Sequence, residues 1–246
     1  MVALLVEDPD LGDGLDRARL ESAVRELRAR TVLVPAGEWV EPDWPVGVRS
    51  GMGLLVLEGL LLRRVDVENR YGAELLGAGD LLRPWQREDA IASVPRRSGW
   101  RVLNRSRLAI LDVEFVRRLA AYPEVAGQIV GRALRRSRQL AVNMAIVHQP
   151  RVETRIMMLL WHLADRCGTV RADGVVVPMR LTHAMLGDLV AARRPTVSAA
   201  LGSLQRSGLV TRGPEGWRLE GSQPPELAEV IPAAAAAHAG DGRPTP

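Results

Sequence analysis

The segment Leu181–Val210 constrains the fold more than any other part of this 246-residue chain, because it has the pattern of two short helices joined by a tight turn. Thr182 is a good N-cap for the first helix, whose apolar residues recur at helical spacing. Pro195 suits the first turn of the second helix, where its missing N–H is not needed. Val197 and Leu204 belong to an apolar stripe that would bury one side of that helix.

The second helix opens on paired arginines, Arg193 and Arg194, and the hydroxyl groups of Thr196 and Ser198 follow on its outward side. A helix that buries one side and presents arginines and hydroxyls from its N-terminal end can read bases in the major groove of DNA. For this segment alone, the alternative is an ordinary pair of helices with a solvated basic turn.

The flanking residues favour a winged helix. Val175–Val177 upstream, and Leu209–Arg212 and Trp217–Leu219 downstream, have the composition of strands, and Gly213–Gly216 is a strong turn. Helix, strand, helix, turn, helix and β-hairpin is the order of elements in a winged-helix DNA-binding unit. The candidate DNA contacts are Thr182, His183, Arg193, Arg194, Thr196, Ser198, Arg212 and Arg218.

Positive charge is concentrated around this unit. Residues 135–218 contain 13 arginines and five acidic residues, a net charge of +8, whereas the whole chain carries +4. Residues 1–134 carry −1 and residues 219–246 carry −3. This distribution suits a surface that neutralises DNA phosphates.

Composition argues against several other classes of protein. The single cysteine, Cys167, excludes a disulfide within one chain, a multi-cysteine zinc site and a cysteine-ligated iron–sulfur cluster. We expect no enzymatic activity and no bound metal, because the sequence has no nucleophile–base pairing, metal-ligand spacing or phosphate-cradling loop. The acidic N-terminus is unlike a secretory signal, and the most apolar run, Gly53–Leu62, is too short to span a bilayer. We therefore expect a cytoplasmic protein without a membrane partner.

We predict an α+β protein with five segments. Residues 1–30 form a helical lead-in, with an amphipathic helix over Leu15–Arg30. Residues 31–112 contain short β-type runs separated by turns, such as those at Glu58-Gly59 and Gly77–Asp80, which predicts an antiparallel β-roll or jelly roll. A long helix over 113–149, a winged helix-turn-helix domain over 150–220 and a disordered tail over 221–246 complete the chain.

The long helix is predicted to form a homodimer. Apolar residues recur along it at steps of three or four residues or their multiples, so they would pack on the same residues of a second copy. These residues are Val125, Ile129, Ala133, Leu140, Met144 and Val147. Arg135, Arg136 and Arg138 interrupt the series, and they either flank the interface or include an arginine that meets a bound anion. Gln149-Pro150 ends the helix and is the expected hinge into the DNA-binding domain.

With a β-roll, a long helix and a winged helix in this order, the chain resembles the Crp/Fnr family of transcription regulators over residues 31–220, most specifically over 151–219. In that family the recognition helix begins with an arginine, an acidic residue and a threonine, and a second basic residue lies four positions after the acid. Arg194, Pro195, Thr196 and Ala199 occupy those positions here. The resemblance implies that Arg194 contacts a guanine and that RNA polymerase is a partner. It does not carry over the family's operator, because the acid and the later basic residue are absent.

The resemblance also implies a sensor in the β-roll. Cyclic-nucleotide binders of the family have a Gly-Glu pair for the ribose, followed by Arg-Ser for the cyclic phosphate. Arg97 and Ser98 match the second motif, but the Gly-Glu pair is missing, and an unpartnered buried hydroxyl costs about 1–3 kcal/mol. We therefore expect neither cAMP nor cGMP as the effector, and no required cofactor. Trp85 and Trp100 either line a pocket for an unknown effector, together with Arg97 and Ser98, or belong to the core.

The leading interpretation is a homodimeric, sequence-specific transcription regulator that binds a two-fold symmetric operator in double-stranded DNA. An effector would act by shifting the hinge between arrangements that fit the operator and arrangements that do not. The alternative is a module that senses a nucleotide or another small molecule and acts through protein partners. The charge of residues 135–218 and the predicted wing favour DNA as the partner.

Overall fold

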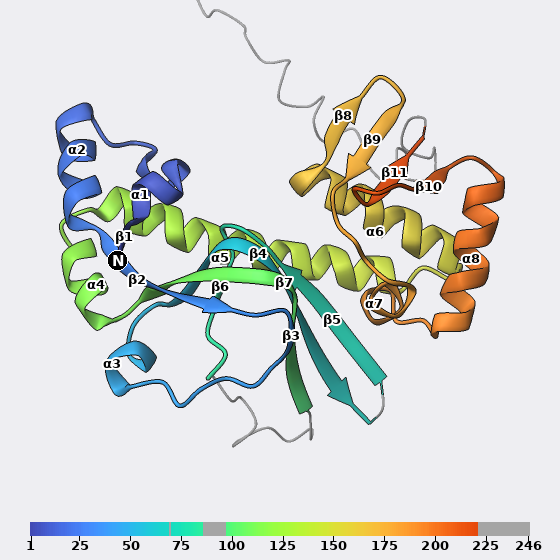
Figure 1. Ribbon diagram of the computed structural model, residues 1–246, viewed down its shortest axis with the longest axis horizontal. Coiled ribbons are helices and arrows are strands. Elements are labelled where there is room, and N and C mark those ends of the chain that lie inside the picture. The colour runs from blue at the N-terminus through green and yellow to red at the C-terminus, as the bar shows by residue number, and fades with distance from the viewer. Residues whose placement is uncertain (69, 86–96, 221–246) are drawn as a thin grey trace, which may run out of the picture. The chain divides into compact units, whose positions relative to one another are not determined.

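The computed structural model describes residues 1–68, 70–85 and 97–220, which belong to two compact units (Figure 1). The first unit is Met1–Met144, and the second begins at Ala145. The predicted α+β class is confirmed, since the first unit holds an antiparallel sheet and the second a helix-turn-helix with a small sheet. The predicted tail, 221–246, lies outside the described residues. None of the described helices has the length and apolar character needed to cross a membrane.

The chain begins with β1 (Val2–Ala3), α1 (Leu4–Glu7), the 3-10 helix η1 (Pro9–Gly12) and α2 (Arg17–Glu26). Asp16 caps α2, and its carboxylate accepts a hydrogen bond of 2.9 Å from the backbone N–H of Arg19. The helix is shorter than the predicted Leu15–Arg30, because the chain becomes extended at Arg28 and pairs with other strands from there on.

The sheet of the first unit is antiparallel, with the strand order β1-β2-β7-β4-β5, while β3 pairs with β7 and β6 with β4. Its further strands are β2 (Arg28–Val34), β3 (Gly37–Trp39), β4 (Gly53–Val67), β5 (Arg70–Leu76), β6 (Leu81–Leu82) and β7 (Arg97–Leu111), and α3 (Val46–Arg49) precedes β4. Side chains alternate between two cores. Leu54 and Leu108 pack with Trp100 inside the roll, while Leu55 and Ala109 pack against the helices.

One predicted turn is wrong, and another is confirmed. Glu58-Gly59 lies inside the continuous strand β4, at a β-bulge opposite β7. Gly59 has a φ of +108°, and a Cβ there would lie 2.6 Å from the Cα of Ser106, so only glycine fits this bulge. Gly77–Asp80 is a turn in which the Gly77 N–H donates to the Asp80 carboxylate at 2.8 Å.

The prediction of one long helix over 113–149 is wrong in one respect, since this segment forms two helices, α4 (Val113–Leu119) and α5 (Pro123–Val147). Pro123 is the first residue of α5, a position where its missing N–H is not needed. Asp112 caps α4 by accepting a 2.9 Å hydrogen bond from the N–H of Phe115. Phe115, Leu119, Val125 and Ile129 are buried with α1 and α2 in the helix-side core of the first unit. The start of α5 is therefore fixed against its own β-roll.

The second unit has the predicted winged-helix order. It consists of α6 (Val152–Cys167), β8 (Thr169–Arg171), β9 (Gly174–Val177), α7 (His183–Leu189), α8 (Arg194–Arg206), β10 (Val210–Arg212) and β11 (Trp217–Leu219). The sheet order is β10-β11-β9-β8, so the β10–β11 wing is extended by the β8–β9 hairpin. Val177, Trp217 and Leu219 are buried on one face of this sheet.

Candidate nucleic-acid interface

The first helix of the helix-turn-helix, α7, is capped as the sequence predicts. The hydroxyl of Thr182 accepts a 3.3 Å hydrogen bond from the N–H of Met185. The turn after α7 is tight, since Ala191 has a φ of +50° and the N–H of Ala192 donates to the carbonyl of Gly187 at 2.9 Å. A Cβ on Gly187 would lie 2.6 Å from the carbonyl oxygen of Ala192 in this turn. A larger residue at position 187 would therefore push the two helices apart.

Arg155 of α6 holds this turn in place. Its Nη1 donates to the carbonyl oxygens of Val190 at 3.2 Å and Ala191 at 3.4 Å. Its Nε donates to the carbonyl of Gln149 at 2.6 Å. One guanidinium therefore satisfies carbonyl groups of both the helix-turn-helix and the segment before α6, which is the predicted hinge. The sequence alone gave no signal for this contact.

The second helix, α8, presents its N-terminus to solvent. Val197, Ala200, Leu201 and Leu204 are buried, whereas the predicted contacts Arg193, Arg194 and Thr196 are exposed. Arg193 is the N-cap residue, and its side chain makes no capping hydrogen bond. Neither Arg193 nor Arg194 has a carboxylate partner among the residues that the structure describes, so both guanidinium groups are available to an anion. Helix N-termini of this kind also attract phosphate through their exposed N–H groups.

Ser198 and His183, two further predicted contacts, bind each other. The hydroxyl of Ser198 donates to the carbonyl of Arg194 at 3.0 Å, and Nδ1 of His183 lies 2.8 Å from the same hydroxyl oxygen. Because the hydroxyl proton is used by the carbonyl, the ring must donate its Nδ1 proton to the hydroxyl. This contact connects α7 to the first turn of α8.

Of the two wing arginines, Arg212 lies on the same face of the small sheet as Trp217, which contacts the helix-turn-helix at His183. Its guanidinium lies over the Trp217 ring, 5.7 Å from the ring centroid, and the His183 ring is 6.4 Å from the same indole. Trp217 is buried, so it gives both side chains a fixed support. Arg212 itself is exposed.

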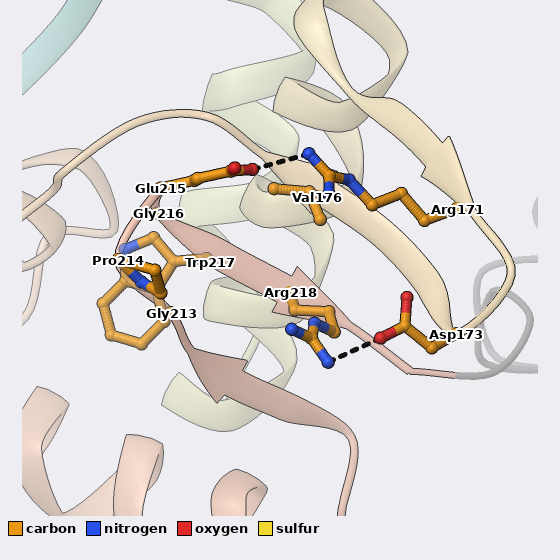
Figure 2. Close-up of a pocket in the computed structure, with 9 residues that line it drawn as sticks. All are labelled: Arg171, Asp173, Val176, Gly213, Pro214, Glu215, Gly216, Trp217 and Arg218. Atoms are coloured by element: carbon orange, nitrogen blue, oxygen red, sulfur yellow. Dashed lines mark hydrogen bonds and ion pairs between the residues drawn. The ribbon is translucent and has the colours of Figure 1, made fainter.

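Arg218 lies on the other face of the small sheet, because strand neighbours alternate and Trp217 faces inward. Its Nη1 donates to the carboxylate of Asp173 at 2.7 Å, and Arg171 donates to Glu215 at 2.7 Å (Figure 2). The two ion pairs join β8–β9 to the wing and, together with Val176, border a pocket on this face. The other residues lining this pocket are Gly213, Pro214, Gly216 and Trp217. Arg218 is therefore engaged within the protein, unlike Arg212.

The candidate effector residues of the β-roll are not alike in exposure. The Arg97 side chain is 85% exposed and pairs with Asp66 at 3.5 Å, and Ser98 beside it is also exposed. Trp100 is buried in the core of the roll, where it meets Trp39 edge to face. Trp85, partly buried, packs against Trp44 in the same core, with ring centroids 5.8 Å apart.

Arg136, for which the sequence left open a place beside the interface or contact with a bound anion, pairs with a carboxylate of the protein itself. Its Nε and Nη2 donate to the two carboxylate oxygens of Glu74 at 3.1 and 2.5 Å, and its Nη1 donates to the carbonyl of Leu81 at 2.8 Å. Arg63 of β4 also contacts Glu74, at 3.5 Å. Glu74 is buried and Arg136 partly buried, and their contact fastens α5 to β5 and β6 within the first unit. Glu74 was not recognisable from the sequence, because nothing local marks it as a partner of a residue 62 positions away.

The predicted dimer residues of α5 lie in different environments. Val125 and Ile129 are fully buried in the first unit, so their side chains are already covered. Ala133, Leu140 and Met144 are exposed, and Val147 is half-buried. A second series that the sequence analysis did not single out includes Val130 and Leu134, which are 51% and 56% exposed. Within the described part of the chain, no group of three histidine, cysteine or acidic side chains could hold a metal ion.

Residues 154–230 match the family model of the Crp-like helix-turn-helix domain. Similar solved structures include a variant of CooA from Carboxydothermus hydrogenoformans, with 15% identity, a TM-score of 0.63, and coverage of 94% of this chain and 95% of that one. A cyclic nucleotide-binding domain containing protein from Listeria monocytogenes has 15% identity and a TM-score of 0.61, covering 78% and 89%. A CRP-family transcriptional regulator from Thermus thermophilus has 20% identity and a TM-score of 0.54, covering 84% and 96%. No curated protein matches the sequence significantly.

Proposed function

We propose that this chain, whose residues 154–230 match the Crp-like helix-turn-helix domain, is a DNA-binding transcription regulator of the Crp/Fnr family and acts as a homodimer on a two-fold symmetric operator. Each subunit places the N-terminal part of α8 in a major groove. The two half-sites then lie about one helical turn apart, ~34–36 Å. As a member of this family, the protein is not an enzyme.

The observation that carries the proposal is the group of side chains around the start of α8. Arg193, Arg194 and Thr196 are exposed there. Arg212 of the wing packs on the Trp217 ring, and the same ring lies beside His183 of α7. Arginine at this position can donate two hydrogen bonds to a guanine, while Arg212 is placed for a phosphate. We leave Arg218 out of the interface, because its guanidinium is paired with Asp173.

The proposed dimer forms through the exposed stripe of α5. This stripe follows alternating steps of four and three residues, the spacing of a coiled-coil seam, and consists of Val130, Leu134, Ser137, Ala141 and Met144. Leu140 lies at its edge and is 37% exposed. The contribution that we expected from Val125 and Ile129 is replaced by that of Val130 and Leu134, each of which lies five residues further along the helix.

The remaining parts of the proposal follow from the family. RNA polymerase is the proposed protein partner, and the cytoplasm is the proposed location. An effector would act through the segment Gln149–Arg151, where Arg155 binds the Gln149 carbonyl and the turn of the helix-turn-helix at once. No cofactor is needed for the DNA contact itself, and cAMP and cGMP are not the proposed effectors.

The test is a selection of bound sequences from random duplex DNA, repeated with two variants. Arg194→Ala should relax the preference at one position of each half-site, since an arginine–guanine contact discriminates by about 1–3 kcal/mol. Arg212→Ala should weaken all sequences about equally, as phosphate contacts do. Arg17→Ala, an exposed arginine of α2, is the control for loss of charge. An unchanged preferred sequence in Arg194→Ala would refute the placement of α8.

A further inference from the structure

Arg206, in the last turn of α8, lies on the side of this helix that faces directly away from the protein. The opposite side of α8 is defined by its buried residues, which are Val197, Ala200, Leu201 and Leu204. With 3.6 residues per turn, position 206 falls opposite the centre of that buried side. Arg206 is exposed there.

The Arg206 side chain runs back along the helix toward its N-terminus. Its Nη1 lies 3.5 Å from the place that a Cβ on Gly202, one turn earlier, would take. Because Gly202 has no side chain, the guanidinium group can lie against the helix at this point. The Cα–Cβ bonds of an α-helix tilt toward its N-terminus, which favours this course. The charge of a residue in the last turn is thereby carried back toward the middle of α8.

This guanidinium group is free to bind a ligand. Within the described part of the chain, Arg206 makes no ion pair and no side-chain hydrogen bond. Residues 189–214, which include all of α8, contain no aspartate or glutamate that could pair with it. Arg155 and Arg218 of the same unit differ in this respect, since the first binds backbone carbonyls and the second binds Asp173.

The position of the guanidinium group suits a base better than a phosphate. When a helix lies in the major groove, the centre of its outward side faces the base edges, and its flanks face the phosphates of the two strands. The other residues of α8 on this centre line are Pro195, Ala199 and Gly202, whose side chains cannot form hydrogen bonds. Arg206 therefore supplies the hydrogen-bonding group on this line, and its planar fork fits the N7 and O6 atoms of guanine.

We propose that Arg206 is a second base-reading arginine of α8, and that it donates to N7 and O6 of a guanine other than the one assigned to Arg194. This inference rests on the proposed function, since it requires α8 to lie in the major groove. Each half-site then contains two guanines read by arginine, one from the first turn of α8 and one from a side chain folded back over Gly202.

The test removes one acceptor atom from the DNA. In the operator obtained by selection, each guanine is replaced in turn by 7-deazaguanine, symmetrically in both half-sites. This base lacks the N7 acceptor but still pairs with cytosine. Affinity for the full-length protein is measured by fluorescence anisotropy at low salt, where weakened variants still bind. At the guanine read by Arg206 we expect a loss of about tenfold or more, as for a hydrogen bond from a charged group.

Protein variants assign each sensitive guanine to its arginine. Arg206→Ala should bind the unmodified operator about fivefold or more weakly, and the effect of 7-deazaguanine should vanish at one position and persist at the guanine assigned to Arg194. Arg194→Ala should show the reverse pattern. Arg151→Ala, at an exposed arginine before α6, controls for the loss of one charge and should keep both effects.

Two outcomes separate this inference from the proposed function. If Arg206→Ala leaves the effect of 7-deazaguanine unchanged at every position, this inference alone is overturned. An equal loss of affinity for all duplexes would then assign Arg206 to a phosphate. A selection that enriches no sequence overturns the proposed function.

Discussion

Nδ1 of His183 lies 2.8 Å from the hydroxyl oxygen of Ser198, and this contact joins the two helices of the helix-turn-helix outside their apolar core. The sequence predicted both residues as separate DNA contacts. In the structure the hydroxyl is also bound to the Arg194 carbonyl, at the position where base contact is proposed. We infer that the pair positions Arg194.

Replacing either member of this pair should therefore have the same effect. His183→Ala and Ser198→Ala should each weaken operator binding about two- to tenfold, as expected for loss of one hydrogen bond of about 0.5–1.5 kcal/mol. The double variant should bind the operator no more weakly than the single variant with the lower affinity. A double-mutant cycle measured by fluorescence anisotropy tests this. Additive losses would instead mean that each side chain contacts DNA independently.

Arg155 should be essential for the stability of the second unit. Arg155→Met removes the donor to the carbonyls of Gln149, Val190 and Ala191, and hydrogen bonds from a charged group contribute about 1.5–3 kcal/mol. We expect scanning calorimetry to show a lower unfolding temperature for this unit. Arg155→Lys should recover little, since an ammonium group cannot reproduce the planar fork. An equal effect of Arg151→Met, an exposed neighbour, would contradict a specific role for Arg155.

The exposed stripe of α5 predicts the outcome of charge insertion. Val130→Asp combined with Leu134→Asp should give monomers in analytical ultracentrifugation and weaken operator binding, because each half-site then loses its partner's contribution. Leu33→Asp, at a residue of β2 that is 53% exposed, is the matched control and should stay dimeric. If the double variant still sediments as a dimer, the interface lies elsewhere.

Cyclic nucleotides should leave the protein unchanged. A ligand at 100 times its dissociation constant stabilises the folded state by about 2.7 kcal/mol, which would raise the melting temperature of a chain of this length by about 5 °C or more. We expect flat thermal-shift titrations with cAMP and cGMP for both wild type and Arg97→Ala. The exposure of Arg97 and its pairing with Asp66 support this expectation. A shift in wild type that the variant lacks would make Arg97 a phosphate ligand.

The second unit should lose stability at mildly acidic pH because of His162 in α6. Burial lowers the pKa of His162 from its ordinary 6.5, and the positive charge of Arg166 lowers it further. Between the lowered pKa and 6.5, the unfolded chain binds more protons than the folded one, so the free energy of unfolding falls as pH drops through this window. Melting temperatures measured from about pH 7.5 to about pH 5.5 should therefore decrease. His162→Gln should flatten this dependence, whereas His148→Gln, at an exposed residue, should not.

Features that depend on local pattern were predictable from the sequence. The caps, the tight turn after α7, the apolar stripe of α8 and the wing each depend on residues within a few positions of one another. The bulge at Gly59 was mistaken for a turn, because a glycine with positive φ occurs in both, and only the pairing of β4 with β7 around it distinguishes them. The helix α2 was predicted too long for a related reason, since strand pairing ends it.

The contacts that define the site more finely join residues distant in the chain. Arg136 finds Glu74 and Arg155 finds Val190 only through the fold, and any of the 33 arginines would look equally available in the sequence. The covered side of α5 could not be predicted from the sequence either, because this helix has two apolar sides. Its periodicity does not tell which side the β-roll covers, and Val125 and Ile129 proved to be on the covered side.

The two ion pairs across the small sheet bear on how DNA binding should respond to salt. Duplex DNA holds a layer of condensed cations, and a protein releases about 0.9 of a cation for each phosphate that it neutralises. Arg171 and Arg218 already have carboxylate partners, so in the proposed complex we expect them to displace fewer cations than unpaired arginines would. In the proposed complex, we therefore expect the dependence of affinity on salt concentration to come mainly from the arginines around the start of α8 and from Arg212. It is correspondingly shallower than the 13 arginines of residues 135–218 would suggest.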